Sequence, residues 1–533
     1  MGECTVDGKA GEPIKSTMEM LVRFCGEVGP RLAEWEQRLS ENPAELETLE
    51  QEVGNEYKRG AGLLLAGLVS VVMQTKEFAE ASERTRKEFS TPLAKGRNQK
   101  LGIRLLGGVI MWATSLYCEP KRGLFRKPDD GAVGLHIELA QFGFGKKESP
   151  GVESKISRLT ALCLSFELAR DEANRDGLSI STGAVRRVAQ QCGDDLLKLR
   201  TLQLQQWHAG TLESTNELAG KRITVQIDGG RTRLRGKLRE FTPEPEKLSE
   251  GGLVISDAAG RSKPRSKRTF DGAWREPKLV TIFNHDDKGR MVKESKATID
   301  GTFTGPDAMA ELVALHLHRM GAAKAESITF VSDGAVWIWD RIDAIVKHAG
   351  IPETVRIHQV LDNCHAAHHV SMALASLEIA AEDRMPSYRD LRTRLRNGQW
   401  RYVVKELQQH ADENPDNEDL VTEIAYLTKH GEAGRLSYTV FKGLGLPLGS
   451  GAIESSIRRV INMRLKNSGT FWREENAESM LQLRALVISK RWDERIQLMR
   501  QHRKSTNLTG WAWTTQPMSS KSELESQTAK NTA

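Results

Sequence analysis

Cysteine is scarce and scattered in this chain. The six cysteines among 533 residues stand at positions 4, 25, 118, 163, 192 and 364, and no two of them form a C-x-x-C pair. Zinc ribbons need closely spaced thiolates, and disulfide frameworks need many more cysteines per residue. The sequence therefore argues against both as the organising feature of the fold.

Long apolar runs are also missing. The longest run, residues 61–73, covers about a dozen positions and contains Gly and Ser, whereas a membrane-spanning helix needs about 20 apolar residues. The N-terminus lacks the basic and then apolar pattern of a signal peptide. We therefore expect a cytosolic protein with no membrane partner.

Neither sign of charge is in large excess. Lys and Arg number 77 against 71 Asp and Glu, a net charge of +6. Affinity for a polyanion would have to come from local basic patches, because the global charge is too small. With 39% hydrophobic residues over this length, the chain is long enough for several domains with cores of their own.

Hydrophobic periodicity divides the chain into regions. The predicted regions are a mostly helical N-terminal region (1–95), a small β-hairpin region around Gly107-Gly108 (96–150), a helix-turn-helix-like region (151–220), an α/β domain in two pieces (221–362 and 441–495), an all-helical insertion (363–440) and a C-terminal tail (496–533). Residues 1–12 are expected to be a loose tail, and the polar stretch from about Thr514 to be disordered.

The α/β domain begins with strands and continues with alternating elements. Strands are predicted at 222–228 and 231–239, joined as a hairpin by a turn at Gly229-Gly230, and at 278–284 and 290–299. A helix at 306–320, a strand at 327–332, a helix at 335–349 and a strand at 355–361 follow. This order is typical of a mixed α/β sheet. The long stretch 241–277 is rich in Pro, Gly, Ser and basic residues, which suggests a disordered excursion or a DNA-contacting arm.

Residues 152–197 suggest a helix-turn-helix. One helix is predicted over 157–174 and a second from about Gly183, with Ser181 or Thr182 as its N-cap. Arg186 and Arg187 would project from the first turns of the second helix, where a recognition helix meets the major groove. An ordinary helical pair with solvated arginines fits the same pattern.

Three acidic residues stand at positions that can hold a metal ion. Asp228 and Asp333 each end a short apolar strand and each precede a glycine, and Glu454 lies near the start of a helical pattern after the turn 449–451. Each alone could be a surface acid. Together they are interpreted as one site, because Mg²⁺ prefers carboxylate oxygens and a pair of such ions catalyses phosphoryl displacement. Asp228 would bridge the two ions.

Basic residues follow the third acid. Arg458, Arg459, Arg464 and Lys466 could contact phosphates, although a solvated basic face would look the same. Trp472 could stack on a base or belong to the core.

Cys364 and three histidines lie just after the last predicted strand. His365, His368 and His369 cannot all face one way with Cys364 on a single helix, which disfavours zinc. A structural helix start, or contacts of Asp362 and His365 with DNA near the site, fits better.

Five short motifs together resemble the DDE transposases, and more narrowly the ISKra4 family of bacterial insertion-sequence transposases, over roughly residues 85–490. The motifs are D-G-G-R at 228–231, S-D-G at 332–334, L-D-N-C-H at 361–365, S-G-A-I-E at 450–454 and R-L-K-N-S-G-T-F-W at 464–472. The family usually carries a cysteine-rich knuckle after its early hairpin, and this chain keeps only Cys118 there.

The resemblance implies a ribonuclease H-like catalytic domain with Asp228, Asp333 and Glu454 as catalytic residues and ligands of two Mg²⁺ or Mn²⁺ ions. It implies binding to double-stranded DNA, namely the element's terminal inverted repeats and a target, with Arg231 among the contacts. A dimer and a location in the bacterial cytoplasm, at the nucleoid, are also expected.

Other functions remain open on the sequence. A metal-dependent nuclease or resolvase of the same fold would cut DNA without joining it. A DNA-binding protein descended from a transposase would bind without chemistry. Glycosidases also use paired carboxylates, but the Arg and Lys residues around Glu454 favour a polyanion.

Overall fold

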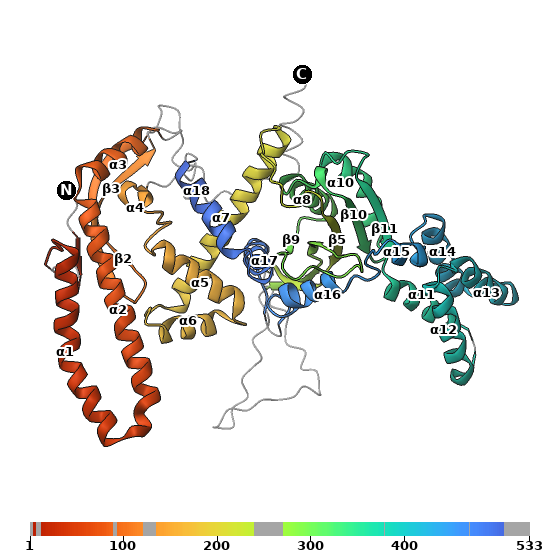
Figure 1. Ribbon diagram of the computed structural model, residues 1–533, viewed down its shortest axis with the longest axis horizontal. Helices are drawn as coiled ribbons and strands as arrows, with labels where there is room; N and C mark the ends of the chain where they lie inside the picture. The colour runs from red at the N-terminus through yellow and green to blue at the C-terminus, as the bar shows by residue number, and fades with distance from the viewer. Residues whose placement is uncertain are drawn as a thin grey trace, which may run out of the picture.

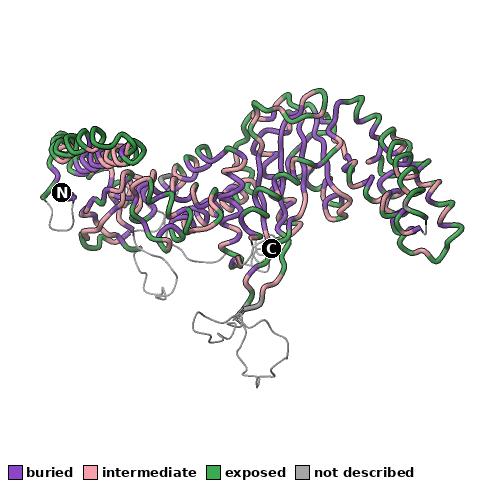
Figure 2. Tube along the Cα trace, turned by 90° about the horizontal axis from the view of Figure 1, so that it is seen from below, coloured by how far each residue is buried: buried purple, intermediate pink, exposed green. Residues whose placement is uncertain are grey.

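The computed structural model describes residues 4–6, 12–88, 93–120, 135–238, 270–377, 379–467 and 470–505. The molecule is elongated (Figure 1): a helical hairpin forms one end, a mixed sheet lies in the middle, and a helical unit forms the other end. Buried residues concentrate along the strands of the central sheet, and the outer faces of the end units are exposed (Figure 2). The prediction of a C-terminal tail at 496–533 was wrong for residues 496–505, which belong to the last helix, and the stretch from Thr514 lies outside the described residues.

The N-terminal region is a helical hairpin on a small antiparallel sheet. Its elements are β1 (Cys4–Val6), α1 (Thr17–Glu41), η1 (Pro43–Glu45), α2 (Leu46–Met73), α3 (Lys76–Glu88), β2 (Leu93–Arg104), β3 (Ile110–Pro120) and β4 (Leu135–His136). β2 and β3 form the predicted hairpin, and its turn uses positive φ at Gly107 and Gly108. The prediction of a loose tail was wrong for residues 4–6, because β1 pairs with β3.

No single helix among the described residues is long and apolar enough to cross a membrane. The segments 43–73 and 76–87 together meet the length and composition criteria, but they are bent by 74° where they meet.

Helices α4 (Ile137–Gln141), α5 (Pro150–Leu162), α6 (Phe166–Arg175) and α7 (Thr182–His208) connect the two sheets along the chain. The single helix predicted over 157–174 was wrong: it breaks at Cys163, and Ser165 caps α6 by accepting a hydrogen bond from the Leu168 N–H. Ser181 caps α7 as predicted. α7 then runs on as one helix to His208.

The central sheet has five strands in the order β11-β10-β5-β8-β9. Its strands are β5 (Arg222–Gly229), β8 (Lys278–Asn284), β9 (Thr298–Thr302), β10 (Ser327–Ser332) and β11 (Arg356–Leu361). β5 pairs antiparallel with β8 and parallel with β10, so the sheet is mixed, as expected. The helices between the later strands are α8 (Pro306–Arg319), η2 (Ala322–Lys324), α9 (Val336–Trp339) and α10 (Ile342–His348). Of the strand predicted at 290–299, only residues 298 and 299 belong to β9, and Met291 forms an isolated bridge with His285.

A two-stranded ribbon extends the β5–β8 pair beyond this sheet. β6 (Thr232–Leu238) pairs with β7 (Phe270–Arg275) and not with β5. The predicted hairpin at Gly229-Gly230 was wrong, because neither glycine has a positive φ and the Gly230 N–H donates to the Pro277 carbonyl at 2.9 Å. The chain therefore passes from β5 into β6 without reversing direction. Residues 239–269, most of the predicted excursion, lie outside the described residues.

The remaining elements are helical, as predicted for 363–440. They are α11 (Asn363–Ala375), α12 (Ala381–Arg396), α13 (Trp400–Glu413), α14 (Glu418–Glu432), α15 (Tyr438–Gly443), α16 (Gly451–Ile457), the π-helical turn η3 (Arg458–Asn462), α17 (Glu474–Ile488) and α18 (Trp492–Ser505). α16 packs on β5 and β8, and α17 packs on β9 and α7.

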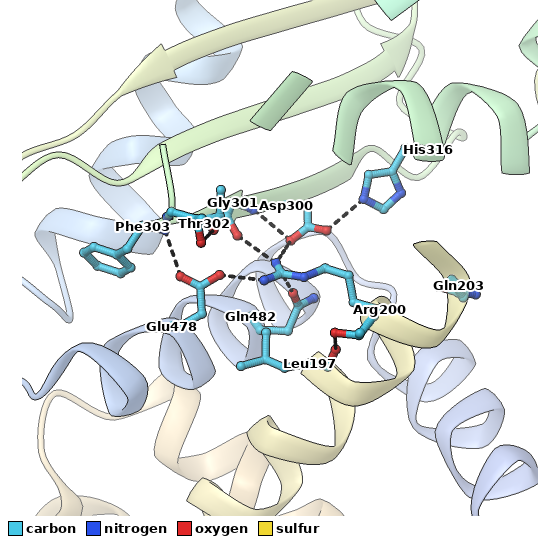
Figure 3. Close-up of polar contacts among 12 residues, drawn as sticks. Leu197, Arg200, Gln203, Asp300, Gly301, Thr302, Phe303, His316, Glu478 and Gln482 are labelled. Carbon is cyan, nitrogen blue, oxygen red and sulfur yellow. Dashed lines mark hydrogen bonds and ion pairs between the residues drawn. The ribbon is translucent and has the colours of Figure 1, made fainter. Parts of the chain in front are cut away.

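A buried polar cluster fixes α7 to the sheet (Figure 3). Arg200 of α7 reaches between β9 and α17, where its guanidinium donates to the Gly301 carbonyl at 2.9 Å. It also pairs with Glu478 at 2.6 Å and with Asp300 at 3.4 Å. The other carboxylate oxygen of Asp300 lies 2.8 Å from His316 Nε2. Arg200, Asp300 and His316 are almost fully enclosed, and Glu478 is partly buried. Since these groups are paired with one another, the cluster holds the helical region against the sheet.

Candidate active site

Three aspartates stand at the carboxyl ends of three adjacent parallel strands. Phe330 of β10 lies opposite Val225 of β5, so continuing this register by three residues sets Asp333 opposite Asp228. Ser332 lies opposite Leu361 of β11, so the next pair in register is Asp333 and Asp362. The topology therefore brings Asp228 and Asp333 to one edge of the sheet, although they are far apart in the sequence.

The side chain of Ser332 locks this register where the backbone ladder ends. Its hydroxyl donates to the Ile227 carbonyl at 3.1 Å and accepts from the Ile227 N–H at 3.4 Å. Ile227 immediately precedes Asp228, and Ser332 immediately precedes Asp333. The two acids are thus held by a direct link between their neighbours.

Asp228 is a partly buried carboxylate beside another negative charge. Burial, followed by the charge of Asp333, raises the pKa of Asp228 from 3.8 to about 6, against a hydrogen bond from the Gly229 N–H at 2.6 Å that favours the ionised form. A cation that enters the site would stabilise the ionised form of this carboxylate. The observation marks Asp228 as a candidate functional residue.

Helix α16 is fastened to the strand of Asp228 through Gln226. This side chain is 1% exposed; its amide nitrogen donates to the Gly449 carbonyl at 2.9 Å and its oxygen accepts from the Ile453 N–H at 3.0 Å. Side chains two apart on a strand share a face, so Gln226 and Asp228 point the same way. Glu454, next to Ile453, is exposed at the start of α16, and its Oε1 accepts from the Ser450 hydroxyl at 3.2 Å.

Glycine at position 230 allows this close docking. A Cβ there would overlap Ile461 of η3, and Ile457 of α16 lies close behind. Likewise, a Cβ at Gly334 would overlap the ring of Tyr426 from α14. The glycines near Asp228 and Asp333 therefore make room for the helices that cover the site.

Asp362 holds these elements in place. Its Oδ1 accepts from the N–H groups of Cys364 at 2.6 Å and His365 at 2.9 Å, which caps α11, and its Oδ2 accepts from the Ser450 N–H. The side chain is 1% exposed. The prediction that Asp362 contacts DNA was wrong, because both its oxygens are buried and committed to the backbone. His365 is half-buried, and a positive charge on its ring would favour ionisation of Asp228.

The helical insertion covers the Asp333 side of the site. Trp339 of α9, which is not part of the insertion, also lies on this side, and its Nε1–H donates to the Asp333 carbonyl at 2.8 Å. The Tyr426 ring stacks on His369 with centroids 3.5 Å apart, and His369 Nδ1 lies 2.5 Å from the Glu423 carboxylate. Burial, and then the charge of Asp333, raises the pKa of Tyr426. This aromatic cluster was missed by sequence reasoning, since α14 shows no motif.

Two predicted DNA contacts lie inside the core. Arg464 is 2% exposed and donates to the Leu164 carbonyl at 2.9 Å, and its guanidinium lies 4.9 Å from the centroid of the Trp472 ring. Trp472 is 7% exposed and tilts against Phe166 at 5.8 Å. Neither side chain faces a surface that DNA could reach, so both predictions are corrected: these residues join the helical region to the segment after η3.

The other predicted contacts are on the surface. Arg231, Arg458, Arg459 and Lys466 are exposed, as are Arg186 and Arg187 on the first turns of α7. Among the described residues, no three His, Cys, Asp or Glu side chains are gathered closely enough to hold a metal ion. The structure thus pairs Asp228 with Asp333 but does not group Glu454 with them.

Comparison with known proteins gives little. No family model matches the chain, and no curated protein matches it. Among solved structures, it is similar to a Drosophila P element transposase strand transfer complex, with a TM-score of 0.22 and 10% identity over 64% of this chain and 80% of that chain. A TM-score this low defines neither a shared fold nor a shared function.

Proposed function

We propose that this chain is a DDE transposase with a ribonuclease H-like catalytic domain, which binds the ends of an insertion sequence, cuts them and joins them to a target. The observation that supports the proposal best is the register of β5 and β10, which pairs Asp228 with Asp333 at the edge onto which α16 is docked. Three antiparallel strands followed by two parallel ones, in the order found here, suit that fold.

The carboxylates fit a hard divalent cation. Asp228 and Asp333 would bind Mg²⁺ or Mn²⁺ through oxygen, and the raised pKa of Asp228, which is caused by burial and by the charge of Asp333, indicates a site that favours a cation. Bound there, such ions would activate the attacking water or 3′-hydroxyl and stabilise the leaving oxygen. Glu454 is the proposed third ligand; it is exposed and hydrogen-bonded only to Ser450 among the described residues.

The basic side chains would hold the DNA backbone around these acids. Arg458 and Arg459 follow Glu454 on the π-helical turn, and Arg231 follows Asp228 just before the ribbon begins. All three are exposed and can meet phosphates. Arg186 and Arg187 on α7 would make a separate contact with the transposon end, as the N-terminal residues of a recognition helix do.

The test is cleavage and strand transfer on DNA carrying the element's own ends, with Mg²⁺ or Mn²⁺. Asp228→Ala, Asp333→Ala and Glu454→Ala are each expected to abolish both reactions while DNA binding persists. Asp307→Ala removes an exposed carboxylate from α8 and serves as the matched control, with activity expected to stay within a factor of about two.

Other outcomes would overturn the proposal in distinguishable ways. Cutting without joining would identify a nuclease or resolvase. Binding without chemistry by the wild-type protein would identify a transposase-derived DNA-binding protein. Full activity of Glu454→Ala would remove that residue from the site and leave the two aspartates.

A further inference from the structure

The β6–β7 ribbon carries an exposed tryptophan surrounded by cations. Trp274 of β7 is 45% exposed and lies opposite Arg233 of β6, whose guanidinium is 4.7 Å from the ring centroid. The guanidinium of Arg231 lies 5.7 Å from the same centroid, and the Lys466 ammonium, from a distant part of the sequence, lies 6.0 Å from it. Three cations thus converge on one solvent-facing ring.

A structural role does not require this arrangement. A single cross-strand Arg–Trp pair would stabilise a ribbon, and a single exposed aromatic residue is unremarkable on any protein surface. Three cations around one ring, however, repel one another, and no ion pair with a carboxylate is found for Arg231, Arg233 or Lys466 among the described residues. The cost of this repulsion is offset when an anion binds between them.

The ribbon base is fixed to the body, so the cluster is preorganised. The Arg235 N–H donates to the Trp472 carbonyl at 2.6 Å, and the Thr232 hydroxyl donates to the Leu465 carbonyl at 2.9 Å. The second bond ties β6 to the residue that precedes Lys466. The ring and the ammonium are therefore held together by backbone contacts and not by their own attraction alone.

The cluster also lies close to the candidate active site. Arg231 follows Asp228 by three residues, so their Cα atoms are at most about 11 Å apart even in a fully extended chain. That separation corresponds to only a few nucleotides. DNA held at Asp228 would pass the exposed ring.

We infer that Trp274, with Arg231, Arg233 and Lys466, forms a stacking site for an unpaired nucleobase and its flanking phosphates. Bases inside a duplex already stack on their neighbours, so an aromatic ring can receive only a base that is unpaired or displaced from the helix. The guanidinium and ammonium groups suit the phosphates on either side. The inference rests on the proposed function for the identity of the nucleic acid as DNA.

The experiment measures binding of the full-length protein to a short fluorescein-labelled oligodeoxythymidylate and to a fully paired duplex, at one fixed salt concentration. Trp274→Ala is expected to weaken single-strand binding roughly 5- to 100-fold and duplex binding by less than about twofold. Trp274→Phe, which keeps a ring, should retain most of the single-strand affinity. Lys466→Ala should lower the salt dependence of binding.

Tyr402 provides the matched control. It is 41% exposed on α13 and stacks with Arg394 at 3.9 Å, so it is an Arg–aromatic pair outside this cluster. Tyr402→Ala should leave both affinities unchanged. Unchanged single-strand binding by Trp274→Ala, or equal losses on single strand and duplex, would overturn the stacking site. Because binding is measured without cleavage, loss of the proposed transposase activity would not mimic either result.

Discussion

The side-chain oxygen of Gln226 accepts a hydrogen bond from the Ile453 N–H at 3.0 Å, which joins the strand of Asp228 to the helix of Glu454. The same amide donates to the Gly449 carbonyl, so one buried side chain satisfies both backbone groups at the start of α16. Gln226→Ala removes the donor to the Gly449 carbonyl, whereas the Ile453 N–H keeps its bond to the Ser450 carbonyl at 3.0 Å. The variant is expected to cost about 1–3 kcal/mol in the free energy of unfolding. Urea unfolding measures this loss.

The same variant tests whether α16 positions Glu454. DNA cleavage by Gln226→Ala should fall by at least tenfold under conditions where the protein is still folded, while duplex binding changes little. Thr281→Val is the control: it removes a hydroxyl that donates to Ser456 farther along α16, and cleavage should be retained. Equal activity of Gln226→Ala and wild type would show that the docking is structural only.

Asp228 is expected to destabilise the folded protein at neutral pH. Its folded-state pKa of about 6 lies above the ordinary value of 3.8, so the carboxyl ionises at a lower pH in the unfolded state than in the folded state. The free energy of unfolding therefore decreases as the pH rises from about 4 through 6. Asp228→Asn keeps an acceptor for the Gly229 N–H and removes the charge. It should be about 1–2 kcal/mol more stable than wild type near neutral pH and show no gain near pH 4. Thermal melts across this range provide the measurement.

Metal binding should depend on the same carboxylate. A cation competes with the proton on Asp228, so Mn²⁺ should raise the melting temperature of the wild type at about pH 7.5 and much less at about pH 5, below the pKa of about 6. Asp228→Asn and Asp333→Asn should lose most of this shift at either pH. A Mn²⁺-induced shift that survives in both variants would place the ion elsewhere.

Asp300 is a buried carboxylate whose pKa is shifted in the opposite direction to that of Asp228. Burial opposes its charge, but His316 and Arg200 lower its pKa to about 2, so the ionised form is the stable one at all working pH values. Asp300→Asn removes the negative charge that pairs with Arg200 and His316, and it should lower the free energy of unfolding by about 3–5 kcal/mol. At neutral pH, Asp300→Asn should therefore lower the free energy of unfolding, whereas Asp228→Asn should raise it. Denaturant unfolding of the two variants under the same conditions checks this difference.

Gly334 and Tyr426 should be energetically coupled. A methyl group at 334 overlaps the Tyr426 ring, so Gly334→Ala is expected to cost about 2–3 kcal/mol in the wild-type background. In a Tyr426→Ala background the same change should cost less than about 1 kcal/mol, because the ring is gone. Additive losses in the double variant would argue against this packing.

Local sequence determined much of the sheet and its acidic edge. The apolar runs that end at Asp228, Asp333 and Asp362 predicted β5, β10 and β11 closely, since a short segment of mostly apolar and β-branched residues favours a β-strand. Ser181 predicted the start of α7, because its hydroxyl accepts the Ala184 N–H and satisfies a helix-terminal donor. Gln226 was also visible as a polar residue in an apolar strand, although its role was missed.

Tertiary structure decided which charged and aromatic side chains face the solvent. Arg464 looks like a surface contact in sequence, and Trp472 fits a surface or a core position, yet both are buried. Arg464 donates to the Thr160 and Leu164 carbonyls, some 300 residues away. Asp362 stands in the same register as the other two acids, but the Ser450 N–H brought by α16 takes up its second oxygen. Strand periodicity depends on neighbouring residues alone, whereas burial and bonding of a side chain depend on segments that only folding brings together.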